Sequence, residues 1–68
     1  GRIDLLLQTK DYIYIIEGKI DSTADVALQQ IEEKGYAKPF VDDPRKIFKI
    51  GVSFSTENRR IEDWKIAE

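Results

Sequence analysis

Two apolar runs separated by three polar residues constrain the fold of this chain more than any other feature. Ile3 to Gln8 and Tyr12 to Ile20 are rich in β-branched and aromatic residues, which favour strands. Thr9-Lys10-Asp11 lies between them and predicts a tight hairpin. Both runs are apolar at consecutive positions, whereas a strand with one solvated face alternates. We therefore expect both faces of this hairpin to be covered.

The segment after the hairpin predicts one helix. Ser22 followed by Asp25 is close to a capping box, and Gly35 is a natural helix stop with Pro39 just beyond it. Between these points, small and apolar residues keep the spacing of one helical face: Ala24, Ala27, Leu28, Ile31 and Gly35.

Two more strands are predicted after a loop from Lys38 to Pro44. Lys46 to Phe54 alternates, which predicts one core face. Ile61 to Ile66 is a shorter last strand, in which we expect Trp64 to lie in the core or an interface. The order β-β-α-β-β predicts a single α/β domain over residues 1–68, with a mixed or antiparallel four-stranded sheet and one helix. The predicted core face of the third strand consists of Phe48, Ile50, Val52 and Phe54.

Composition excludes several classes of site and of partner. The chain has no cysteine and no histidine, which excludes disulfides, thiolate or imidazole metal sites and histidine-activated nucleophiles. The absence of cysteine fits a reducing, cytoplasmic compartment. A net charge of −2 argues against a protein that coats nucleic acid, and no run is apolar enough to span a bilayer. Since the chain has no methionine, we expect it to be part of a longer protein.

The hairpin register predicts a carboxylate pair. With a two-residue or four-residue loop, Asp4 falls directly opposite Glu17, and Lys19 lies on the same face. A three-residue loop without a compensating bulge would put the two acids on opposite faces. Two like charges opposed in this way repel, so Lys19 or a divalent cation should offset them. Mg²⁺ suits such a site because it takes one or two carboxylates plus water. The alternative is a solvated ion cluster at a strand end.

These residues resemble the PD-(D/E)XK nuclease superfamily, in which a strand carrying an aspartate is followed by a strand ending in Glu-x-Lys and then a helix. Within it, the chain is most similar to the C-terminal nuclease-like domain of bacterial AAA-ATPase-like proteins. The resemblance covers nearly the whole chain. It rests on Gly1-Arg2-Ile3-Asp4, Glu17-Gly18-Lys19, Ala27-Leu28-Gln29-Gln30-Ile31, Gly35-Tyr36 and Ile50-Gly51-Val52-Ser53-Phe54.

The resemblance implies a role for each motif residue. Asp4 and Glu17 would bind Mg²⁺ or Mn²⁺, helped by the backbone carbonyl of Gly18. Lys19 would orient or activate the attacking water and stabilise the charge that develops on the phosphorus.

Two further positions of this branch, Gln30 and Tyr36, would lie near the site as accessory residues. The alternatives are a solvated helix residue for Gln30 and a ring packed after the helix cap for Tyr36. The chain departs from the family pattern at Gly18, where relatives carry a bulky apolar residue. The superfamily core also begins with a helix and a strand ahead of the aspartate, so we expect residues 1–68 to be a domain truncated at its N-terminus.

The resemblance implies metal-dependent hydrolysis of phosphodiesters in DNA or RNA. The alternative is a non-catalytic interaction or oligomerisation domain of an ATPase-associated protein, in which the acids are a relic. Because the first two strands are apolar on both faces and one helix cannot cover both, we expect a homo-oligomer. Five basic residues could track phosphates or form a solvated face: Lys34, Lys38, Arg45, Lys46 and Lys49.

Overall fold

The computed structural model describes residues 2–68, with side chains from Asp4 onward, so the Gly1 of the family motif lies outside the described part. It confirms the predicted α/β class and element order. The sheet is mixed, with strand order β1-β2-β3-β4: β1 and β4 are antiparallel to their neighbours, and β2 and β3 are parallel. The elements are β1 (Arg2–Gln8), β2 (Tyr12–Ile20), α1 (Ala24–Lys34), the short 3₁₀ helix η1 (Lys38–Phe40), β3 (Lys46–Ser55) and β4 (Arg60–Ala67).

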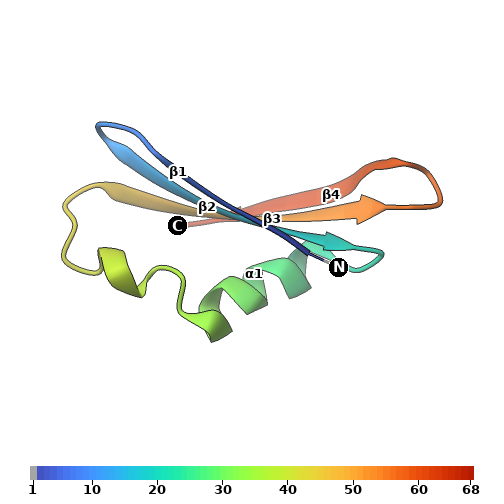
Figure 1. Ribbon diagram of the computed structural model, residues 1–68, viewed down its shortest axis with the longest axis horizontal. Helices are drawn as coiled ribbons and strands as arrows, with labels where there is room; N and C mark the ends of the chain where they lie inside the picture. The colour runs from blue at the N-terminus through green and yellow to red at the C-terminus, as the bar shows by residue number, and fades with distance from the viewer. Residues whose placement is uncertain (1) are drawn as a thin grey trace.

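Helix α1 is the crossover between the parallel strands β2 and β3, and it lies with η1 on one side of the sheet (Figure 1). The core forms beneath it, where Ile31 of α1 packs against Ile13 and Ile15 of β2. All three side chains are buried. None of the helices in residues 2–68 has the length and apolar character needed to cross a membrane.

The ends of α1 follow local sequence signals, with one correction. The N-cap is Thr23, whose hydroxyl accepts a hydrogen bond from the Val26 amide at 3.1 Å, so the predicted capping by Ser22 is wrong by one residue. Gly35 ends the helix as predicted, with φ of 66°, a conformation that glycine adopts without steric cost.

Gly51 of β3 lets α1 approach the sheet closely. A Cβ at this position would lie 2.4 Å from the Ala24 carbonyl oxygen and 3.0 Å from the Leu28 amide nitrogen, both backbone atoms of α1. Backbone cannot move aside as the end of a side chain can, so only glycine fits. The helix therefore rests on the face of β3 that carries Gly51.

Because α1 packs against Gly51, the core face of β3 that the sequence predicted is wrong. Phe48, Ile50, Val52 and Phe54 point away from α1, to the opposite face of the sheet. In the described part of the chain no element covers that face (Figure 1), so the prediction that both faces of the hairpin are covered is wrong. On the other face α1 packs on β2, while Leu6 of β1 is 47% exposed.

We call the uncovered face the open face. Its central part consists of three cross-strand rows: Leu7, Tyr14 and Phe48; Leu5, Ile16, Ile50 and Ile66; and Gly18, Val52 and Trp64. The pair Tyr12 and Lys46 lies at one end of these rows, and the pair Ile20 and Phe54 at the other.

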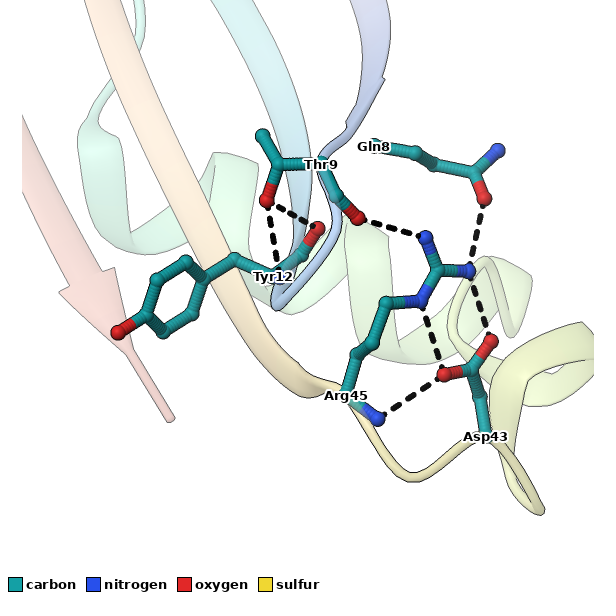
Figure 2. Close-up of polar contacts among 5 residues, drawn as sticks. All are labelled: Gln8, Thr9, Tyr12, Asp43 and Arg45. Atoms are coloured by element: carbon teal, nitrogen blue, oxygen red, sulfur yellow. Dashed lines mark hydrogen bonds and ion pairs between the residues drawn. The ribbon is translucent and has the colours of Figure 1, made fainter.

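Arg45 ties the β1–β2 turn to the loop that precedes β3 (Figure 2). Its guanidinium donates to the Thr9 carbonyl at 3.0 Å, to Gln8 Oε1 at 2.9 Å and to both carboxylate oxygens of Asp43. The Arg45 guanidinium and the Arg45 backbone amide both donate to the Asp43 carboxylate, and these hydrogen bonds lower the pKa of Asp43 to about 2. The clamp joins two turns that are far apart in the sequence, and sequence analysis did not anticipate it.

Adding a methyl group at Gly51 should destabilise the fold. We expect Gly51→Ala to lower the free energy of unfolding by about 1–3 kcal/mol, because the helix must shift off β3. For a domain of this size, each kcal/mol corresponds to a fall of roughly 4–8 °C in Tm. Gly18→Ala is the matched control, since it adds the same methyl group to a neighbouring strand on the open face. Equal melting temperatures for the two variants would contradict the close approach.

Candidate active site

Asp4 and Glu17 face one another across the β1–β2 ladder, in the register that the sequence predicts. Glu17 is in turn paired with Gly51 of β3, and Lys19 with Ser53. Because side chains alternate along a strand, Asp4, Glu17 and Lys19 all project to the face that α1 covers. The three predicted catalytic residues are therefore brought to one place on the sheet.

Glu17 is the most enclosed of these residues, with no exposed surface. The neighbouring helix supplies a polar contact through Gln30. In the amide orientation that satisfies both of its polar atoms, the Gln30 nitrogen donates to Glu17 Oε2 at 3.0 Å, and its oxygen accepts from Lys19 Nζ at 3.2 Å. Gln30 thus links the carboxylate and the ammonium of the Glu-x-Lys motif, and it is not a solvated helix residue.

Asp4 lies at the exposed rim of the same site. The Tyr36 hydroxyl donates a long hydrogen bond of 3.4 Å to Asp4 Oδ2, from just beyond the C-terminus of α1. A cavity of about 250 Å³ opens beside this contact, lined by the two residues and by Leu6, Ile15 and their neighbours. Both accessory residues named from the sequence, Gln30 and Tyr36, therefore contact the acid pair.

Ser53 belongs to the same neighbourhood, and sequence analysis did not single it out. It is 4% exposed, pairs with Lys19 across β2 and β3, and donates from Oγ to the Ser22 carbonyl at 2.5 Å. That bond holds the start of the crossover against β3, next to the lysine. Alternation along β3 could have placed Ser53 on the site face, because it lies two residues from Gly51.

Gly18 lies between the two motif residues, on the opposite side of the sheet from them. It pairs with Val52 in β3, so it lies in the third row of the open face. The role of its carbonyl as a metal ligand stays a prediction.

Three of the five basic residues that could track phosphates are paired with carboxylates. Lys46 is paired with Glu68, Lys49 with Glu32 and Arg45 with Asp43, while Lys34 Nζ lies 6.0 Å from the centre of the Tyr36 ring. Such exposed ion pairs are typical of a solvated face, and phosphate tracking stays a prediction.

Comparison with known families identifies the superfamily of this chain. A family model of the PD-(D/E)XK nuclease superfamily matches residues 1–64. The chain belongs to this superfamily. Superfamily members are typically metal-dependent. The Asp4, Glu17 and Lys19 of this PD-(D/E)XK domain occupy the strand positions described above. Its placement among the domains of AAA-ATPase-like proteins stays a prediction.

One relative and one negative result complete the comparison. This PD-(D/E)XK domain is 35% identical over 63 residues to an "uncharacterized protein in vnfD 5′ region" of Azotobacter chroococcum mcd 1. The alignment covers 90% of the chain but only 12% of that relative, so the domain corresponds to a small part of the relative. No solved structure matches the chain significantly.

Loss of the Gln30 amide should destabilise the domain through Glu17. We expect Gln30→Ala to lower the free energy of unfolding by about 1–3 kcal/mol, because a buried carboxylate loses a donor. Gln29→Ala is the matched control: Gln29 is exposed one residue earlier and donates to Glu33 at 3.0 Å. It should change stability by about 0.5 kcal/mol or less. Urea denaturation measures both, and equal effects would contradict the contact with Glu17.

Proposed function

We propose that this domain is the catalytic core of a Mg²⁺- or Mn²⁺-dependent nuclease that hydrolyses phosphodiester bonds in DNA or RNA. The observation that carries the proposal is the pairing of Asp4 with Glu17 across β1 and β2, with Lys19 on the same face. Superfamily membership supports the reaction class. The arrangement combines two anionic ligands for a hard cation with one cationic side chain for a phosphate.

The donor set fits a small divalent cation. Two carboxylates from paired strands can share one ion, and oxygen ligands are those that Mg²⁺ prefers. Within residues 2–68 no group of three or more histidine, cysteine or acidic side chains gathers around a common point. The remaining ligand positions would therefore fall to the Gly18 carbonyl, to water and to the substrate phosphate. The bound ion would polarise a phosphoryl oxygen and make water a better nucleophile near neutral pH.

The residues of the site would have different roles, according to how deeply each is buried. Glu17 is enclosed and contacts Gln30, so it provides the fixed side of the site. Asp4 stands at the exposed rim with Tyr36, where a substrate could enter. Lys19 would hold the water and counter the negative charge that develops on the phosphoryl oxygens. Gln30 would position Lys19 and Glu17 relative to one another, as a positioning residue.

Substrate affinity should be modest in this chain alone. Nucleic-acid binding draws on cations that replace the counterions of phosphates, and here Arg45, Lys46 and Lys49 are already paired with carboxylates. Recognition of a long DNA or RNA would then depend on surfaces of a larger protein. This is consistent with a relative of which the domain covers 12%.

The test is cleavage of labelled single-stranded and double-stranded DNA and RNA in Mg²⁺ or Mn²⁺, with EDTA as the blank. We expect Glu17→Gln and Lys19→Gln each to lower the cleavage rate by about 10²-fold or more, because each removes a charge required in the transition state. Glu57→Gln and Lys10→Gln are matched controls on exposed turns and should retain activity.

Two results would overturn the proposal. Cleavage that survives in folded Glu17→Gln would place the activity elsewhere. Absence of metal-dependent cleavage on all four substrates would favour the alternative, a non-catalytic interaction domain that retains the acids as a relic.

A further inference from the structure

The chain that leaves the end of β2 stays bonded to β3 beyond the sheet ladder. The last ladder pair is Ile20 with Phe54, and the Asp21 amide then donates to the Phe54 carbonyl at 2.8 Å. One residue further, the Ser22 carbonyl accepts a 2.5 Å hydrogen bond from the buried Ser53 hydroxyl. The first two residues of the crossover are therefore fixed to β3 before α1 begins.

The Asp21 carboxylate adds a contact with the turn between β3 and β4. Its Oδ1 accepts from the Thr56 amide at 3.0 Å, and its Oδ2 accepts from the Thr56 hydroxyl at 2.6 Å. These hydrogen bonds, the one from the hydroxyl above all, hold the pKa of the Asp21 carboxyl below its usual range. We call the contacts of Asp21 and Ser22 with residues 53–56 the latch.

The backbone of Asp21 is strained. Its φ is 54°, in the left-handed region that residues other than glycine adopt rarely, although aspartate tolerates it better than most. Such a conformation costs free energy, persists only where the surroundings fix it, and is found most often at functional sites. The latch provides that fixation at the point where the chain leaves the sheet.

Lys19 is the functional residue that lies next to the latch. It is the second-last residue of β2, and it pairs with Ser53 across β2 and β3. The ends of strands open locally unless other contacts hold them. A lysine has a flexible four-carbon stem, so its ammonium stays in one place only if the strand end is fixed and the ammonium has a partner. Gln30 is that partner, at 3.2 Å from Lys19 Nζ.

We infer that Asp21 is a positioning residue for Lys19. Through its hydrogen bonds with Thr56 it keeps the end of β2 on β3, and this holds the Lys19 ammonium beside Gln30 and the acid pair. Loss of the latch would let the strand end open and move the ammonium away from the metal side of the site. The consequence for cleavage rests on the proposed function, whereas the mobility of Lys19 can be measured without a substrate.

The test is NMR relaxation of the lysine ammonium nitrogens in the 68-residue chain, with the amide spectrum as the check of folding. We expect a higher order parameter for Lys19 than for Lys10, which is on an exposed turn. Asp21→Gly removes the carboxylate but adopts the left-handed backbone without steric cost, and it should lower the Lys19 order parameter by about a third or more. Thr56→Val, on an exposed turn, should lower it too. Asp21→Asn keeps an acceptor oxygen and tolerates this backbone, so it should restore most of the order.

Thr9→Val is the matched control, because the Thr9 hydroxyl also bonds across an exposed turn but at the other end of β2, where it accepts from the Tyr12 amide at 2.9 Å. It should leave the Lys19 order parameter unchanged. In the cleavage assay, Asp21→Gly and Thr56→Val should lower kcat by about 10-fold at unchanged KM, because a misplaced charge stabilises the transition state less well. Mn²⁺ affinity should stay the same in all of these variants.

Three results would overturn the inference. The first is a folded Asp21→Gly variant with the same Lys19 order parameter as Thr9→Val, which would leave the latch a support of the fold alone. The second is a Lys19 ammonium as mobile as that of Lys10 in the unsubstituted chain. The third is a lower kcat with unchanged Lys19 mobility. Absence of cleavage in the unsubstituted chain would overturn the proposed function instead, because the order parameter still decides the inference.

Discussion

Glu17 is a carboxylate with no exposed surface, held in an interior strand of the sheet beneath α1. Removing an ionised carboxylate from water costs several kcal/mol unless other groups compensate. The compensation comes from Gln30 and from the nearby Lys19. Gln30 can reach Glu17 only because Gly51, the residue paired with Glu17 in β3, lets the helix approach without a Cβ in the way. The close packing of α1 on β3 therefore also brings the residues of the candidate site together.

The two faces of the sheet carry different residues because side chains alternate along each strand. The face under α1 carries the apolar core at one end and Asp4, Glu17 and Lys19 at the other. The opposite face is apolar throughout its three rows and has no cover among residues 2–68. Consecutive apolar positions in β2 follow from this division, since Ile13 and Ile15 enter the core while Tyr14 and Ile16 lie on the open face. In β1 the apolar residues on both faces stay about half exposed.

Local and short-range features could be predicted from the sequence. The apolar runs predicted both hairpin strands, and a loop of two or four residues predicted the observed register that opposes Asp4 to Glu17. Gly35 predicted the end of α1. Such features depend on neighbouring residues or on one turn, which is why a single sequence carries them.

Features that depend on residues far apart in the chain could not be predicted. The alternation of β3 does not say which of its faces the helix covers, and the apolar set is the one that α1 leaves open. The deciding contact joins Gly51 to the backbone of Ala24 and Leu28, which no local pattern reveals. The clamp from Arg45 to Gln8 and Thr9 is of the same kind. The proximity of Gln30 and Tyr36 to the acids came from family resemblance, because spacing alone left both as ordinary helix and cap residues.

The central claim is that Asp4 and Glu17 together hold one divalent cation. A Mn²⁺ titration followed by paramagnetic broadening of amide signals tests it most directly, with excess Mg²⁺ as the competitor. The account predicts broadening centred on Asp4 and Glu17 that Mg²⁺ reverses, and that Asp4→Asn and Glu17→Gln each abolish while Asp42→Asn, on an exposed loop, does not. Broadening that is absent around these two residues, or that persists unchanged in Asp4→Asn, would contradict it.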